Sequence, residues 1–498
     1  MNVNPITRLD YPDLDVIRVE DTYYMVSTTM HFMPGCEILQ SFDLVHWEHM
    51  TYVYETLDHT DAQQLKSGQN IYGQGMWAAS LRYHEGRFCI CFVANDTRKT
   101  YLYTSEKIDG PWKKQLIEGF YHDGSLLFDE DGRNYIVYGN DEIWITELNE
   151  DLTAPKKDGL HRLLVSDHKN PELGYEGSHI QKINGYYYIF LIHSLRDRWM
   201  RTEACFYSDS LEGEFTGGDV LCDDRGYCGQ GVAQGGIVDT PDGKWYAMLF
   251  QDSGAVGRIP ILLPVTWKDH FPFFGQNGHV PEEIEVHSTR PGYIYQPLVG
   301  SDDFCNGLLP RWQFNHDPDP RYYHLDALQG TYTITTREVC TELTQAVNTL
   351  TQRMSYPSCA AEVTVDASAL KEGDVAGLCA LQSCYAAVGI TKHHGKYEVL
   401  MLDKKEDGIL DMTEGTVVES HQMDFRLEAD FCNMKDEARC YYRVNKGDWL
   451  PIGTVHKLYF KLDHFTGCRF GLFCYAAEET GGSACFRDFK YYDVDEIS

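Results

Sequence analysis

Five stretches of the chain repeat one pattern of apolar and polar positions: a short apolar run, a tight polar turn and a second apolar or aromatic run. The clearest copy spans residues 175–190, where Asn184-Gly185 forms the turn. Asn-Gly between two such runs is a strong signal for a β-hairpin. The hairpins of the other four copies begin at Val16, Leu81, Leu126 and Ile237.

Hairpins at intervals of about 45–65 residues are typical of repeat architectures. Because no long amphipathic helix pattern separates them, they favour a β-propeller, whose blades are four-stranded sheets. We therefore expect an all-β protein in which residues 1–290 form a five-bladed β-propeller. The pattern ends at a Pro- and Gly-rich linker near residues 276–300. Short turn-punctuated strands follow, for example 330–334 and 470–475, and predict a β-sandwich over residues 301–498.

Polar or aromatic residues stand three or four positions before each hairpin and share one register. They are Asp13, Trp77, Asp123, Glu176 and Gln234. A propeller gathers equivalent positions into a ring around its axis, so these side chains should meet in one pocket. A pair of carboxylates in a pocket is typical of glycoside hydrolysis.

The carboxylates are ambiguous when each is taken alone. Asp13 and Asp123 also fit ordinary turn residues, and only their common register favours function. Asp15 lies two residues after Asp13 and would share its strand face. The residues alone therefore leave open whether Asp13 or Asp15 acts.

The composition excludes several classes of function. A net charge of −32 argues against nucleic acid and anionic membranes as partners. There is no apolar run long enough for a membrane helix and no signal-peptide pattern at the N-terminus. The 16 cysteines contain no C-x-x-C spacing, so we expect reduced thiols in a cytoplasmic protein. No H-E-x-x-H or G-x-S-x-G motif is present, and residues 229–236 lack the G-x-G-x-x-G spacing of a nucleotide loop.

These motifs resemble glycoside hydrolase family 43, the β-xylosidases and α-L-arabinofuranosidases. The Pro-Asp of the opening segment implies that Asp13, rather than Asp15, is the general base. His122-Asp123-Gly124-Ser125 is similar to the segment whose Asp orients the substrate and tunes the acid. Glu176-Gly177-Ser178-His179 resembles the family's Glu-Gly-Pro-His, whose Glu is the general acid. Ser178 stands where the family has Pro.

The resemblance also implies the residues that bind the sugar. Trp77 matches a Trp of the sugar pocket, and Arg258 matches an Arg that contacts the bound sugar. We also expect two further residues to contact the substrate: Phe32 as an apolar wall, and Gln234 from the ring of equivalent positions. Many members have His where Gln234 stands, near a central ion or water, so we expect that no cofactor is required, although calcium stays possible. The region after residue 301 is similar to the concanavalin-like sandwich of exo-acting members.

Together these features predict an inverting exo-glycosidase that releases a terminal pentose, α-L-arabinofuranose or β-D-xylose, from oligosaccharides such as arabinoxylan fragments. Asp13 would activate water and Glu176 would protonate the leaving oxygen. Asp123 would keep Glu176 protonated by like-charge repulsion. A non-catalytic carbohydrate-binding propeller and an endo-arabinanase-like enzyme are the alternatives. The sequence leaves open which pentose is preferred and whether the protein forms a homo-oligomer.

Overall fold

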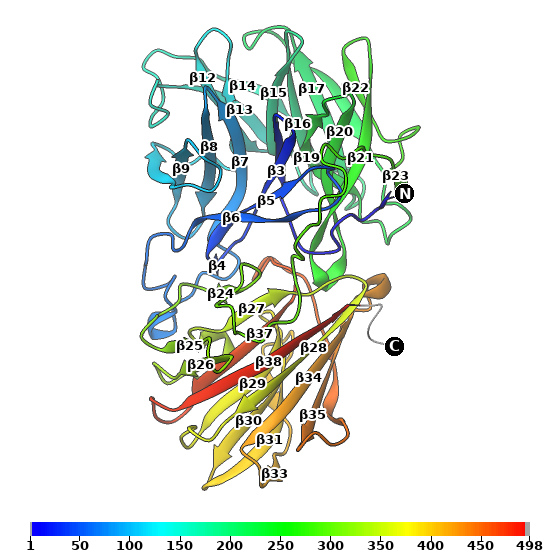
Figure 1. Ribbon diagram of the computed structural model, residues 1–498. Coiled ribbons are helices and arrows are strands. Elements are labelled where there is room, and N and C mark those ends of the chain that lie inside the picture. Colours follow the sequence, from blue (N-terminus) through cyan, green and yellow to red (C-terminus); the bar gives the residue numbers. More distant parts are fainter. Residues whose placement is uncertain (1, 494–498) are drawn as a thin grey trace.

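The computed structural model describes residues 2–493 and contains strands, turns and four three-residue 3₁₀ helices. Figure 1 shows two bodies stacked end to end, with the N-terminal half above and the C-terminal half below. The upper body is a five-bladed β-propeller and the lower body is a concanavalin-like β-sandwich, as predicted. The 3₁₀ helices cover Lys66–Gly68, Gly254–Val256, Leu343–Gln345 and Cys432–Met434.

Each blade is a four-stranded antiparallel sheet whose strands follow in chain order from the axis outward. The first blade contains β2 (Asp15–Val19), β3 (Thr22–Ser27), β5 (Gly35–Ser41) and β6 (Glu48–Tyr54), and the second contains β7 (Met76–His84), β8 (Arg87–Ala94), β9 (Lys99–Ser105) and β10 (Lys113–Ile117). The third contains β11 (Ser125–Phe128), β12 (Asn134–Asn140), β13 (Glu142–Leu148) and β14 (His161–Ser166). The fourth contains β15 (Glu176–Ile183), β16 (Tyr186–Ser194), β17 (Arg201–Ser208) and β18 (Thr216–Leu221), and the fifth contains β19 (Val232–Asp239), β20 (Trp245–Asp252), β21 (Arg258–Lys268) and β22 (Phe271–Phe274).

The predicted hairpins are the two innermost strands of each blade. Asn184 and Gly185, between β15 and β16, both have positive φ (51° and 86°), which is the requirement of a type I′ turn. The first strands β2, β7, β11, β15 and β19 contact one another in that order, and β19 returns to β2. The short pair of β1 (Asn2–Val3) and β23 (Glu283–Ile284) joins the start of the chain to the end of the propeller.

Asp15 ties three blades together at the axis. Its carboxylate accepts a hydrogen bond from the Leu81 amide, forms an ion pair of 2.6 Å with Arg82 and lies 3.2 Å from Nδ1 of His179. Burial opposes ionisation, but Arg82 and His179 outweigh it and lower the pKa of Asp15 to about 2. Asp15 therefore has a structural role, consistent with the choice of Asp13 as the acting residue.

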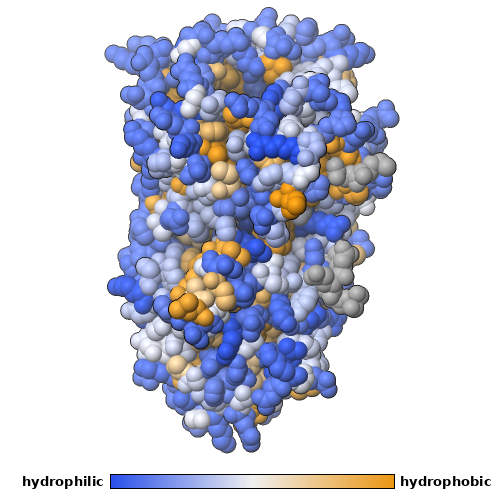
Figure 2. Space-filling model, viewed as in Figure 1, coloured by the Kyte–Doolittle hydropathy of each residue, from blue (hydrophilic) through white to orange (hydrophobic). Residues whose placement is uncertain are grey.

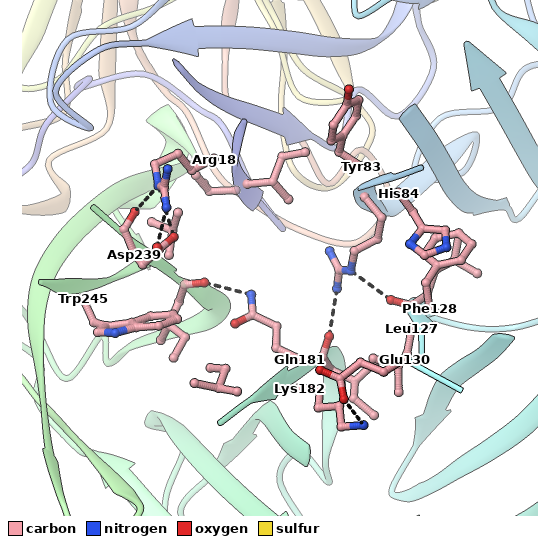
Figure 3. A pocket seen from close by; sticks show the side chains of 18 residues that line it. Arg18, Tyr83, His84, Leu127, Phe128, Glu130, Gln181, Lys182, Asp239 and Trp245 are labelled. Carbon is pink, nitrogen blue, oxygen red and sulfur yellow. Dashed lines mark hydrogen bonds and ion pairs between the residues drawn. The ribbon is translucent and has the colours of Figure 1, made fainter. Parts of the chain in front are cut away.

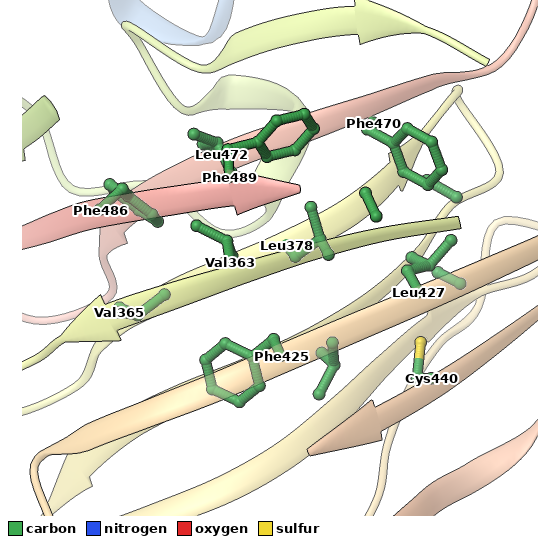
Figure 4. Packing of buried hydrophobic residues seen from close by; sticks show 14 of the residues in the cluster. Val363, Val365, Leu378, Phe425, Leu427, Cys440, Phe470, Leu472, Phe486 and Phe489 are labelled. Carbon is green, nitrogen blue, oxygen red and sulfur yellow. The ribbon is translucent and has the colours of Figure 1, made fainter. Parts of the chain in front are cut away.

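The C-terminal body packs two antiparallel sheets face to face. One sheet runs β32 (Leu410–Met412), β31 (Lys396–Lys404), β30 (Ala386–His393), β29 (Asp374–Leu381), β37 (Arg469–Ala476), β27 (Leu350–Arg353), β24 (Gln313–Asn315) and β4 (Phe32–Met33), with β33 (Thr416–Val418) beside β31. The other runs β25 (Tyr323–Asp326), β26 (Thr331–Thr335), β38 (Ser483–Asp493), β28 (Ser358–Asp366), β34 (Gln422–Asp430), β35 (Glu437–Val444) and β36 (Leu450–Lys457). Figure 4 shows apolar side chains of both sheets, such as Leu378 and Phe425, filling the space between them.

The two bodies share a strand and a buried ion pair. β4 belongs to the propeller chain but pairs with β24 of the sandwich, Phe32 opposite Asn315. Arg353 of β27 reaches Glu37 of β5 at 2.8 Å, and both side chains are buried. The face in Figure 2 is mainly hydrophilic across both bodies, since their apolar groups are packed inside.

Within the described residues, no helix is long and apolar enough to cross a membrane. All sixteen cysteines carry free thiols, and most are buried. The expectation of a cytoplasmic location stays a prediction.

The junction yields a stability prediction. Arg353→Met removes the guanidinium that pairs with the buried Glu37 and leaves this carboxylate only His49, at 3.0 Å, so the free energy of unfolding should fall by about 3–5 kcal/mol. The double variant Arg353→Met/Glu37→Gln, which buries no unpaired charge, should recover much of that loss. Urea unfolding of the intact protein measures both. A single variant as stable as the wild type would contradict the role given to this pair.

Candidate active site

The five residues predicted to share a register do lie at equivalent places, where the innermost strands begin. Glu176 is the first residue of β15, Trp77 the second of β7 and Gln234 the third of β19. Asp13 and Asp123 each stand two residues before β2 and β11. The backbone is irregular at these points: Asp13, Asp123 and Gln234 have φ of 50°, 47° and 60°. Strand pairing also shifts register after Trp77 and after Glu176. These local conformations depart from regular strand geometry just where the five side chains gather.

A cavity of about 580 Å³ opens beside these strand ends and is lined by both bodies. The propeller supplies Trp77, His122, Asn140, Glu172, Leu173, Glu176, Trp199, Arg201, Gln230, Asp252 and Gly254. The sandwich supplies Met434, Phe460, Lys461, Leu462 and Phe465. The cavity is therefore complete only when the sandwich is docked on the propeller.

Asp13 is held by Arg258. The guanidinium donates to Oδ1 of Asp13 at 2.9 Å, and Arg258 is itself only 2% exposed. Oδ2 of Asp13 has no hydrogen-bond partner among residues 2–493. The arrangement fixes one oxygen of the carboxylate and leaves the other available to accept a proton.

Asp123 holds the backbone at Glu176. Its Oδ2 accepts a hydrogen bond of 3.0 Å from the amide of Gly177, the residue that follows Glu176. Burial raises the pKa of Asp123 to about 6; the neighbouring His122 opposes this shift, while Glu176 and Asp13 add to it as like charges. This interaction with both other carboxylates indicates that the three acids lie within one electrostatic environment.

His122 lies between the carboxylates of Asp123 and Glu176, although the sequence pattern did not mark it as a site residue. Its Nε2 lies 3.6 Å from Asp123 and 3.7 Å from Glu176. The carboxylate of Asp123 raises the pKa of His122 to about 9, with smaller contributions from Glu176 and Asp13, so its ring is an imidazolium at neutral pH. Its position directly before Asp123 in the sequence was the signal that could have identified it.

Glu176 lines the cavity and is oriented by Asn140. The amide of Asn140 donates to Oε2 of Glu176 at 2.6 Å, and the His122 ring faces the same oxygen. Because both neighbours engage Oε2, a proton on this carboxyl is best carried by Oε1. Glu176 can therefore present a proton to a bound ligand while its other oxygen is fixed.

Three residues predicted to bind substrate, Phe32, Gln234 and Arg258, are not among the residues that line the cavity, and Arg258 is buried against Asp13. Phe32 is fully buried in β4, where the Arg469 guanidinium lies 3.5 Å from its ring centroid, and it does not line the cavity. The expectation of a Phe32 pocket wall was wrong, because strand pairing with the sandwich takes this residue into the junction. Gln234 is 4% exposed and packs under Gly177, where a Cβ would come within 2.7 Å of its side chain. The Gln234 side chain thus packs against the backbone of Gly177, the residue that follows Glu176.

Residues His122, Asp123 and Glu176 bring one potential ligand atom each within 4.8 Å of one another. His122 must be neutral to bind a metal ion, yet its pKa is raised to about 9. The imidazolium already supplies a positive charge between the two carboxylates. A metal ion bound here would have to displace the proton of His122, and no step of the chemistry is routed through an ion.

The opposite end of the propeller axis has a second cavity, of about 450 Å³. Figure 3 shows Arg18, Gln181 and Trp245 around it, contributed by the hairpin ends of different blades. Its acidic groups are engaged: Arg18 pairs with Asp239 at 2.5 Å and Lys182 with Glu130 at 3.0 Å. The carboxylate cluster suited to acid–base chemistry lies at the other end.

Two family models account for most of the chain. Residues 3–272 match "Glycosyl hydrolases family 43" and residues 301–492 match "Beta xylosidase C-terminal Concanavalin A-like domain". A solved structure described as a bifunctional GH43-CE from Bacteroides eggerthii is 42% identical, with a TM-score of 0.93; the match covers 100% of this chain but 64% of that one.

Two further relatives match along nearly their whole length. A β-xylosidase of Formosa agariphila is 26% identical over 99% of this chain and 89% of its own. A solved GH43 enzyme engineered to display both endo-xylanase and exo-arabinofuranosidase activity is 27% identical, covers 99% of both chains and has a TM-score of 0.86. On the family match, the shared fold and the three gathered carboxylates, the chain belongs to glycosyl hydrolases family 43.

Proposed function

We propose that the protein is an inverting exo-glycoside hydrolase that releases a terminal pentose, α-L-arabinofuranose or β-D-xylose, from hemicellulose-derived oligosaccharides such as arabinoxylan fragments. The observation that carries the proposal is the gathering of Asp13 and Glu176 from different blades, with Glu176 lining the cavity and Asp123 interacting electrostatically with both. Retaining and inverting glycosidases both use a carboxyl pair that flanks the sugar, and inversion further requires a separation of about 6.5–9.5 Å that admits a water molecule. The names of the relatives support the choice of pentoses.

In this mechanism Asp13 and Glu176 have opposite tasks. Oδ2 of Asp13 removes a proton from a water molecule, which attacks the anomeric carbon from one face. Glu176 donates the proton of Oε1 to the glycosidic oxygen as the bond to the anomeric carbon breaks on the other face. Asp123 fixes the Glu176 backbone through Gly177, and Arg258 keeps Asp13 oriented.

The exo preference rests on the shape of the cavity. The sandwich segment that contains Phe460, Lys461, Leu462 and Phe465 contributes part of the lining, which favours a substrate that enters by one end over a polysaccharide that lies across the strand ends. Trp199, 45% exposed, lines the same cavity and offers a ring on which a sugar can stack. An end-on substrate, with its terminal pentose innermost, fits this arrangement.

The division of labour predicts different responses to the loss of each carboxylate. Glu176→Gln removes the proton donor, so cleavage of an unactivated oligosaccharide should fall far more than that of a nitrophenyl pentoside, whose leaving group needs no proton. Asp13→Asn removes the base, so both substrates should suffer alike, by a factor of roughly 10²–10⁴. Steady-state kinetics of both variants on both substrates measure the difference.

Asp15→Asn is the matched control, because Asp15 connects blades to one another and has no part in the proposed reaction. It should lower the unfolding midpoint while the folded molecules keep most of their turnover. If Asp15→Asn abolished turnover and Asp13→Asn spared it, the base would be misassigned. If all carboxylate variants behaved as the wild type, the protein would be a carbohydrate-binding propeller rather than an enzyme. Products of cleavage within an oligosaccharide chain would instead indicate an endo-acting enzyme.

The charges around Glu176 predict opposite shifts in the pH profile. His122→Gln removes a positive charge from beside Glu176, so the basic limb of the pH profile of kcat/KM should move upward. Asp123→Asn removes a negative charge, so the limb should move downward. The double variant should return the limb toward its original position. Profiles measured on an unactivated pentosyl oligosaccharide decide the point; shifts in the same direction would refute this electrostatic account.

The protein is also proposed to need no metal ion for turnover. Two cations, Arg258 and the His122 imidazolium, already face the carboxylates. Dialysis against a chelator should therefore leave most of the activity toward a nitrophenyl pentoside. Loss of activity that calcium restores would show that an ion is part of the site.

A further inference from the structure

Residues 458–468 of the sandwich connect β36 to β37, and four of them line the active-site cavity. In this segment Phe465 adopts a positive φ of 58° and its ring packs on Trp77, with 5.4 Å between the centroids. The Arg258 guanidinium lies 4.3 Å from the centre of the same ring and donates to the Phe465 carbonyl at 3.3 Å. Because Arg258 holds Asp13, the position of Phe465 bears on both the wall of the cavity and the partner of the base.

The residue before Phe465 is part of a buried aromatic cluster that joins the two bodies. We call His31, Tyr72, His316 and His464 the histidine cluster. Its His31 and Tyr72 belong to the propeller, and His316 and His464 to the sandwich. The ring centroids are 5.0 Å apart for His31 and His464, 4.8 Å for His31 and His316, and 5.1 Å for Tyr72 and His464.

The ring nitrogens of this cluster are unusual. Within residues 2–493, both nitrogens of His31 and both of His464 are buried without a hydrogen-bond partner, and His316 accepts only one strong bond, from the Ile71 amide at 3.0 Å. Burial lowers the pKa of all three rings, that of His464 to about 3, and the nearby Arg469 lowers the pKa of His31 and His464 further, whereas Asp463 opposes the shift at His464. The rings are therefore neutral and pack as flat apolar groups, although unpartnered polar atoms are costly to bury.

The propeller backbone also closes directly on this segment. Gly73 has φ of 66°, and a Cβ at this position would lie 2.3 Å from the carbonyl oxygen of Leu462. Only glycine permits so close an approach with this conformation. Residues 462–464 are thus fixed by two separate contacts: the packing of the histidine cluster and the close approach of Gly73 to Leu462.

We propose that His464 is a positioning residue: its packing against His31, Tyr72 and His316 places Phe465 over Arg258 and Trp77, so that docking of the sandwich completes the active site. His464 itself acts only through Phe465. The inference rests on the proposed function, because its test measures KM for a pentoside. In this inference the histidine cluster contributes indirectly to binding of the terminal sugar.

A double-mutant cycle tests the proposal. His464→Ala and Phe465→Ala should each raise KM for a nitrophenyl pentoside by roughly three- to tenfold, the range of an aromatic contact, with a smaller change in kcat. The double variant should be no worse than Phe465→Ala alone, because both changes remove the same interaction. His464→Phe, which keeps a neutral ring, should restore KM. The exposed His421 provides the matched control, and His421→Ala should leave KM unchanged.

A second measurement is independent of catalysis. Hydrogen exchange of residues 458–468, followed by mass spectrometry, should be faster in His464→Ala than in the wild type, and slow again in His464→Phe. Additive effects on KM, or a lower unfolding midpoint with KM unchanged, would overturn the positioning role. If the wild type cleaves no pentoside, the proposed function fails, and unchanged exchange in His464→Ala would then overturn this inference separately.

Discussion

The site depends on balancing buried negative charge. Asp13, Asp123 and Glu176 are gathered at one end of the propeller axis, where Asp13 and Asp123 are buried and an uncompensated carboxylate is costly. Arg258 pairs with Asp13, and the His122 imidazolium lies between Asp123 and Glu176. With these cations in place, two carboxyl groups of the same chemistry occupy different environments, which is how one site can hold both an acid and a base.

This charge balance extends into the second body. Arg258 lies between Asp13 and the ring of Phe465, and its backbone amide donates to Asp10, whose other carboxylate oxygen accepts from the Gly467 amide. The strand β4 and the Arg353–Glu37 pair fasten the same two bodies nearby. The propeller alone therefore provides the carboxylates, and the sandwich provides part of the cavity lining and part of the surroundings of Arg258.

Much of this arrangement could be predicted from the sequence because it is local. The turn at Asn184-Gly185 and the common offset of Asp13, Asp123 and Glu176 from their hairpins follow from short-range pattern, and the structure places them as expected. What failed depends on contacts between distant segments. Nothing in the sequence around Phe32 indicates pairing with β24, and nothing around Phe465 indicates contact with Arg258, more than 200 residues away.

The two ends of the propeller axis differ in how their charged groups are paired, and this difference favours the strand beginnings for the proposed chemistry. At the hairpin ends the chain must turn tightly, and charged side chains such as Arg18 and Lys182 are satisfied by carboxylates within reach of the turn. At the strand beginnings the chain arrives from longer connections, so positive φ values and register shifts are accommodated, and Asp13, Asp123 and Glu176 can be directed toward one another. The repulsion among these three carboxylates is reduced by Arg258 and the His122 imidazolium, but not every carboxylate has its own close cationic partner. A carboxyl group left partly exposed in such surroundings can exchange protons with a substrate. The carboxylates at the opposite end are poorly suited to this, because each is paired with a cation.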